Sequence, residues 1–179
     1  LGQDLAFAAG EGPLLGALPD HAGMEDRLAS GQAAAVLDPA YRAVSQIRGA
    51  LPETTTLIGF AGAPWTIITY MLEGQSSRDF ANARKWMWHN DRQFDELLEI
   101  VTNATIEFLV LQARAGADAL MLFDSWASAV PAHFRQRVVI EPVQKIIAAL
   151  RGEGIKQPVI GFPKGIGEGL LAYCDQTPV

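Results

Sequence analysis

The stretch LIGFAGAPWTIITYMLEG, residues 57–74, decides the fold. Its first five residues are all apolar or glycine, a pattern typical of a strand that is covered on both faces in a parallel sheet. Gly62 and Pro64 then interrupt the strand. The segment that follows is apolar and aromatic and contains one hydroxyl-bearing ring, Tyr70. We therefore expect a buried strand that ends abruptly and is followed by a well-packed segment near its carboxyl end.

Two further strands are predicted, at residues 119–123 and 158–162, and helical patterns lie around all three. The residues up to Gly31 are rich in Gly, Ala and Pro and predict an irregular arm or short hairpin, with a turn at residues 10–13. The expected helices run from an N-cap at Asp38 to just before Pro52, from the capping-box spacing Ser76–Asp79, from about Asn90 or Asp91 to Gly116, and from about Pro131 to Leu150 with a bend or restart at Pro142. A last short helical stretch follows the loop at residues 163–167.

This order of strand, helix, strand, helix, strand predicts an α/β fold with a parallel sheet, either doubly wound or a (β/α)8 barrel. Both architectures place their sites beyond the carboxyl ends of the strands. The chemistry is therefore expected at residues 62–70, 124–128 and 163–167. Three strands do not close an eight-stranded barrel, which takes roughly 200 residues or more, so a barrel would be present here only in part.

Composition narrows the class of protein further. The 179 residues are 49% hydrophobic and carry 14 basic and 20 acidic side chains, for a net charge of −6, with no dense run of Lys and Arg. Nucleic acid is therefore not an expected partner, and no apolar run reaches the length of a membrane span. The single cysteine, Cys174, excludes an internal disulfide framework and suits the cytoplasm. His21, His89 and His133 are far apart in the sequence, and no metal site is predicted.

Each candidate site residue also has an ordinary structural interpretation. Tyr70 is compatible with a core tyrosine, and Asp124 and Ser125 are compatible with helix-cap or turn residues after a strand. No G-x-S-x-G motif accompanies them, so a hydrolase triad is not supported. The FPKGIGEG stretch lacks the spacing of known phosphate-binding loops. The residues alone thus predict an α/β domain with a polar site near Tyr70 and Ser125.

Three motifs carry a more specific resemblance. IGFAGAPWTIITYMLEG, LMLFDSWAS and PVIGFPKG, together with the GQDLAF…GEGP arm, resemble the uroporphyrinogen decarboxylase family, and the likeness extends over essentially the whole chain. The resemblance implies a cofactor-free enzyme of haem biosynthesis, built as a (β/α)8 barrel and usually a homodimer. Such an enzyme converts the four acetate side chains of uroporphyrinogen III to methyl groups, giving coproporphyrinogen III.

The same resemblance implies roles for three residues. Tyr70 matches a tyrosine whose hydroxyl hydrogen-bonds a substrate carboxylate, Ser125 matches a substrate hydrogen-bond donor at a strand end, and Phe123 is expected as an apolar wall for the macrocycle. The family's carboxylate-binding arginine motif and its aspartate would precede this sequence, and its histidine would follow it. Residues 1–179 are therefore expected to be one domain, the central part of a barrel, which is inactive alone and has open sheet edges that favour association.

Two alternatives remain open on the sequence. A cobalamin-linked methyltransferase of the same superfamily would have a similar barrel but would need a zinc site of His and Cys, and Cys174 stands alone. A non-enzymatic porphyrin-binding protein would keep the cleft and lack the chemistry.

Overall fold

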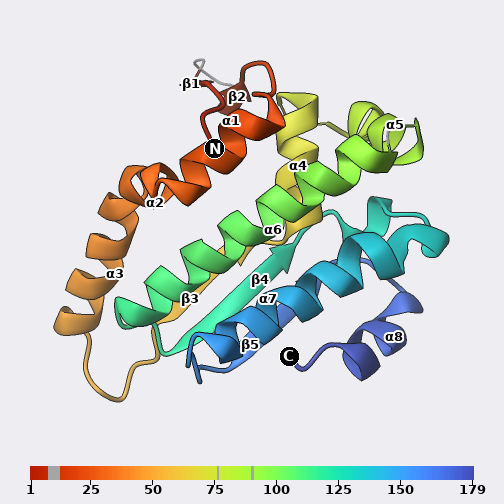
Figure 1. Ribbon diagram of the computed structural model, residues 1–179. Coiled ribbons are helices and arrows are strands. Elements are labelled where there is room, and N and C mark those ends of the chain that lie inside the picture. Colours follow the sequence, from red (N-terminus) through yellow and green to blue (C-terminus); the bar gives the residue numbers. More distant parts are fainter. Residues whose placement is uncertain (8–12, 76, 90) are drawn as a thin grey trace.

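The computed structural model describes residues 1–7, 13–75, 77–89 and 91–179, and its centre is a parallel three-stranded sheet (Figure 1). The strands are β3 (Ile58–Gly62), β4 (Ala119–Asp124) and β5 (Val159–Pro163), with β4 in the middle. Gly62 pairs with Phe123, which pairs in turn with Phe162, so the carboxyl ends of the three strands lie together at the same end of the sheet. The three strands and the parallel pairing predicted from the sequence are confirmed.

One face of the sheet is packed and the other is open. The long helices α6 (Asp91–Arg114) and α7 (Glu141–Gly152) lie along the sheet, and their side chains Leu109 and Ile146 are fully buried (Figure 1). On the opposite face Phe60 is 59% exposed and Phe162 is 43% exposed. The expectation that β3 is covered on both faces is therefore wrong for these 179 residues, because no described segment covers this second apolar face.

The outer edge of β3 is closed at one position by a side chain. The backbone N–H of Phe60 donates to Oε1 of Gln112 at 3.0 Å, and Nε2 of Gln112 donates to the Phe60 carbonyl at 2.9 Å. The N–H of Ala63 points toward β4, where it donates to the Phe123 carbonyl. Because backbone groups alternate along a strand, those of Phe60 point to the opposite edge. Gln112 therefore occupies the place of a neighbouring strand at Phe60.

The arm before the first helix forms a hairpin of β1 (Leu5–Phe7) and β2 (Pro13–Leu15), as the sequence predicted. The expected turn at residues 10–13 lies almost entirely outside the described residues. Two short helices within residues 1–37 were not predicted, namely α1 (His21–Ala29) and α2 (Gln32–Val36). These helices bury few side chains, since Met24 is the one buried residue of α1 and α2 has none. Their sequences therefore lack the apolar periodicity that would indicate a helix.

Two helix starts differ from the sequence prediction. The helix α3 (Asp38–Ala50) has Leu37 as its N-cap, so Asp38 lies in the first turn, where it pairs with Arg42 at 2.6 Å. The helix α5 (Ala81–His89) begins after Phe80, whose φ of 53° is left-handed and incompatible with an earlier helical start. Ser77 accepts the Phe80 N–H, while Ser76 lies outside the described residues.

The predicted helical region from about Pro131 to Leu150 is regular only in its second part. A 3₁₀ turn at Ala127–Ala129 precedes it, and the region itself contains a 3₁₀ turn at Ala132–Phe134, a π-helical turn at Gln136–Ile140, and then α7. Pro142 stands in the first turn of α7, directly after the π-helical turn, and the restart predicted there is confirmed. The last helix, α8, spans Gly169–Gln176.

Candidate active site

The open face of the sheet carries a row of three aromatic rings. The ring of Phe123 lies 5.8 Å from that of Phe60 and 5.9 Å from that of Phe162, both edge to face. Each ring comes from a different strand, and together they form one apolar surface toward the carboxyl ends. Phe123 was predicted as an apolar wall. Phe60 and Phe162 were not, because the register between the strands places them on the same face as Phe123.

Asp124 ends β4, and Ser125 directly follows the strand and is half-buried. The side chain of Asp124 is buried on the helix-covered face, where it accepts a hydrogen bond from the Thr66 hydroxyl at 2.7 Å. Burial raises the pKa of Asp124 to about 6, and hydrogen bonds from Thr66 and from the Trp126 N–H oppose that rise.

Tyr70 lies in α4 (Pro64–Glu73), which leads from the carboxyl end of β3 toward the β1–β2 hairpin (Figure 1). The side chain is half-buried, and its ring centroid is 6.5 Å from that of Trp126. Nε1 of Trp65, in the first turn of α4, donates to the Trp126 carbonyl at 2.9 Å. The structure thus connects the element that carries Tyr70 to the residue that follows Ser125.

Lys164 lies at the carboxyl end of β5, and no role was predicted for it from the sequence. Lys164 directly follows β5, and its backbone N–H donates to the Asp124 carbonyl at 3.0 Å. Its side chain is exposed, with no ion pair among the interactions found for the described residues. The loop 163–167 was expected to contribute to the site, but only the strand register shows that Lys164 neighbours Ser125.

The part of the chain that the structure describes contains neither a metal-binding cluster nor a membrane-spanning helix. Among the residues it describes, no group of three or more His, Cys, Asp or Glu side chains is arranged to hold a metal ion. His21 instead approaches Glu96 at 3.1 Å, and His133 packs against Trp88 and Phe134. No helix within the described ranges is both long enough and apolar enough to cross a bilayer.

A solved methyltransferase from Methanosarcina mazei has a similar fold, with a TM-score of 0.60 over 89% of this chain and 46% of its own. Its sequence identity of 14% shows the fold alone. The parallel three-stranded sheet and this neighbour fit a partial (β/α)8 barrel, as the sequence predicted.

Curated relatives share far more of the sequence. The uroporphyrinogen decarboxylase of Rhodospirillum rubrum is 45% identical over 179 residues, which are 100% of this chain and 51% of that protein. Those of Hyphomonas neptunium and Maricaulis maris are 44% and 42% identical, again over 100% of this chain. The chain spans about half the length of these relatives. Because the family model described as "Uroporphyrinogen decarboxylase (URO-D)" also matches residues 1–179, the chain belongs to the uroporphyrinogen decarboxylase family.

Proposed function

We propose that the natural gene product containing residues 1–179 is a uroporphyrinogen decarboxylase, which removes CO2 from the four acetate side chains of uroporphyrinogen III to give coproporphyrinogen III. The observation that carries this proposal is the aromatic row of Phe60, Phe123 and Phe162, with Ser125 directly after the strand that carries Phe123, in a chain of this family. A large, flat, apolar macrocycle with acidic side chains needs such a surface next to polar groups.

The reaction itself needs few protein groups. Loss of CO2 leaves a carbanion, and a protonated pyrrole ring accepts that electron pair without a cofactor. The protein must then orient the carboxylates, supply protons and exclude water. Under the proposal Tyr70 and Ser125 donate hydrogen bonds to the substrate, Phe123 contacts the macrocycle, and Lys164 adds a positive charge for a carboxylate.

The proposal extends to the organisation of the protein. Residues 1–179 form one domain, the central part of a (β/α)8 barrel, and the strands that cover the open sheet face come from outside this stretch. The enzyme is a cytoplasmic homodimer. The exposed apolar face, and a match to only about half of the relatives' length, support the partial barrel. The family resemblance supports the homodimer, and the single cysteine supports the cytoplasmic location.

The test is an anaerobic assay of the natural full-length gene product with uroporphyrinogen III. After oxidation, the products are separated by their number of carboxyl groups. We expect conversion of the eight-carboxyl substrate to the four-carboxyl product without added metal or cofactor. Binding of the substrate without loss of any carboxyl group would reject the decarboxylase and favour a porphyrin-binding protein.

A further inference from the structure

We propose that Thr66 and Asp124 are positioning residues, which hold the Ser125–Trp126 segment against the first turns of α4 and so fix the placement of Ser125 relative to Tyr70. This inference rests on the proposed function of the site. Under this proposal neither Thr66 nor Asp124 contacts the substrate. They determine the positions of the Tyr70 and Ser125 hydroxyls, which are the candidate substrate-binding groups.

The strand alternation separates Asp124 from the substrate side. Phe123 projects from the open face of β4, and the next side chain along the strand therefore points into the helix layer. Asp124 is 4% exposed, whereas Phe123 and Ser125 are each only partly buried. A carboxyl group in this position does not reach a macrocycle on the open face. It does reach α4, which packs behind the strand end.

Thr66 is the connection between the two elements. The Thr66 hydroxyl donates to Oδ1 of Asp124 at 2.7 Å. The oxygen of that hydroxyl, Oγ1 of Thr66, also accepts a hydrogen bond from the backbone N–H of Trp126 at 3.3 Å. One buried hydroxyl therefore binds the residue before Ser125 through its side chain and the residue after Ser125 through its backbone. With both neighbours held, the backbone of Ser125 has little freedom to rotate.

A second contact holds the other side of the same peptide segment. Nε1 of Trp65 donates to the Trp126 carbonyl at 2.9 Å. Both backbone polar groups of Trp126 are thus bound by adjacent residues in the first turn of α4. The Trp126 ring also packs 5.0 Å from that of Phe80. The segment after β4 is therefore attached to α4 at two points, through Trp65 and Thr66, and packs against Phe80 at a third.

The same helix carries Tyr70 at a fixed offset from Thr66. The two residues are four positions apart, so they lie one above the other on one face of α4. The Tyr70 ring is 6.5 Å from that of Trp126. A change in the Thr66 contacts would move the Ser125 segment relative to Tyr70, and displacements of about 1 Å can cost up to about 100-fold in rate.

Threonine substitutions in the natural full-length gene product test this inference. Thr66→Val removes the hydroxyl at nearly constant volume, and Thr66→Ser keeps it. Thr102→Val is the matched control, because Thr102 is also buried in a helix and its hydroxyl donates to the Leu98 carbonyl at 2.6 Å, away from the site. Decarboxylation kinetics and thermal unfolding are measured for each variant.

We expect Thr66→Val to lower kcat roughly tenfold with KM changed less than about twofold, since positioning acts mainly on the reacting geometry. Thr66→Ser should retain most of the activity, and Thr102→Val should equal the unsubstituted enzyme. Thr66→Ala is the second variant if Thr66→Val does not fold. Equal activity of Thr66→Val and Thr66→Ser would overturn the inference, as would unfolding of both Thr66→Val and Thr66→Ala. An unsubstituted protein without decarboxylase activity would instead reject the proposed function.

Discussion

Asp124 is a carboxyl group held where solvent does not reach it. Burial is the dominant influence on its pKa, which it raises to about 6 against the opposing hydrogen bonds from Thr66 and Trp126. Burial, and then the charge of Asp124, raise the pKa of the Tyr173 phenol. The folded protein therefore keeps a proton on Asp124 at pH values where the unfolded chain has lost it.

This proton has a consequence for the dependence of stability on pH. Between pH 4 and pH 6 the folded state binds more protons at Asp124 than the unfolded state, so the free energy of unfolding falls as pH rises. The loss is about 3 kcal/mol for a shift of this size. We expect unfolding midpoints of the unsubstituted protein, measured relative to those of Asp124→Asn, to fall between pH 4 and pH 7.

Asp118→Asn is the control for that measurement. A hydrogen bond from the Leu57 N–H, followed by one from Arg48, lowers the pKa of Asp118. Asp118 is thus ionised in both states above pH 5, and its substitution should shift the midpoint by a constant amount between pH 5 and pH 7. A constant difference for Asp124→Asn as well would show that Asp124 is ionised in the folded protein throughout.

Lys164 is predicted to bind a substrate carboxylate. In the full-length gene product, Lys164→Gln should raise KM for uroporphyrinogen roughly three- to tenfold and leave kcat within about twofold, because it removes one exposed charge contact. The effect should shrink at 0.5 M salt, where exposed charges are screened. Lys156→Gln, at the other end of β5, is the matched control and should leave KM unchanged. Equal KM values for the two variants would exclude this role.

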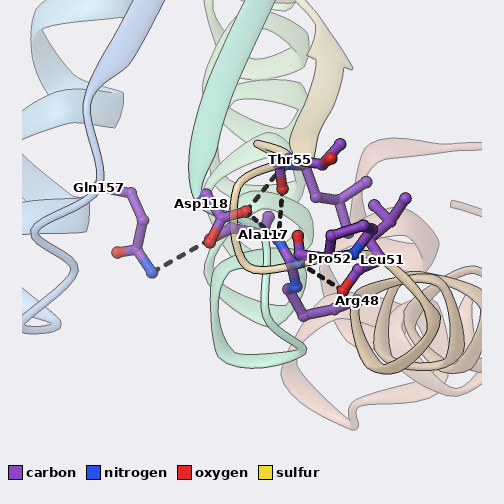
Figure 2. A network of polar contacts seen from close by, with 8 residues as sticks. Arg48, Leu51, Pro52, Thr55, Ala117, Asp118 and Gln157 are labelled. Carbon is purple, nitrogen blue, oxygen red and sulfur yellow. Dashed lines mark hydrogen bonds and ion pairs between the residues drawn. The ribbon is translucent and has the colours of Figure 1, made fainter.

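At the scale of elements, Arg48 connects the segments that enter the sheet. Its guanidinium donates to the carbonyls of Leu51, Pro52 and Thr55 at 3.1, 2.9 and 2.8 Å, and to Asp118 at 2.6 Å (Figure 2). These contacts join the end of α3, the loop before β3 and the start of β4. They lie at the opposite end of the strands from Ser125, where a role in stability is expected.

Arg48→Lys tests this role. A lysine has one compact ammonium group and cannot reach four acceptors that the planar guanidinium contacts together. We expect a loss of about 2 kcal/mol in the free energy of unfolding, from the carbonyls left without a charged donor. Arg42→Lys on the same helix should change little, because the contact that Arg42 makes among the described residues is an exposed pair with Asp38. Chemical denaturation of the full-length protein measures both, and similar losses would contradict the role of Arg48.

The elements also show what sequence patterns reveal and what they do not. Uninterrupted apolar runs located β3 to β5, because both faces of the sheet carry apolar side chains, although the described residues cover only one face. They did not reveal which side chains share a face across strands, so Phe60, Phe162 and Lys164 had no assigned role. That information depends on the register between β3, β4 and β5, which is set by tertiary packing. The contact between Thr66 and Asp124 joins residues 58 positions apart and leaves no local signal.

At the scale of the whole molecule, the exposed aromatic face predicts self-association of the isolated 179-residue chain. Burying that face between copies removes apolar area from water. We expect its mass in light scattering to increase with concentration, and substitution of Phe60 and Phe162 by serine to reduce the increase. Leu171→Ser is the control, because Leu171 is exposed on α8. A monomer at all concentrations would contradict the prediction, and we expect no decarboxylase activity from the isolated chain.

The side chain of Gln112 determines which strand edge of the isolated chain is available for pairing with another copy. Its amide already satisfies the backbone of Phe60, so strand addition along β3 is blocked in the middle of its outer edge. The outer edge of β5 has no strand partner among the described residues. Two copies that join through β5 alone would form a closed pair related by twofold symmetry. Growth into an open-ended filament requires two available edges. Gln112 thus leaves only the outer edge of β5 available for strand pairing among the described residues, and this limits polymerisation of the isolated chain.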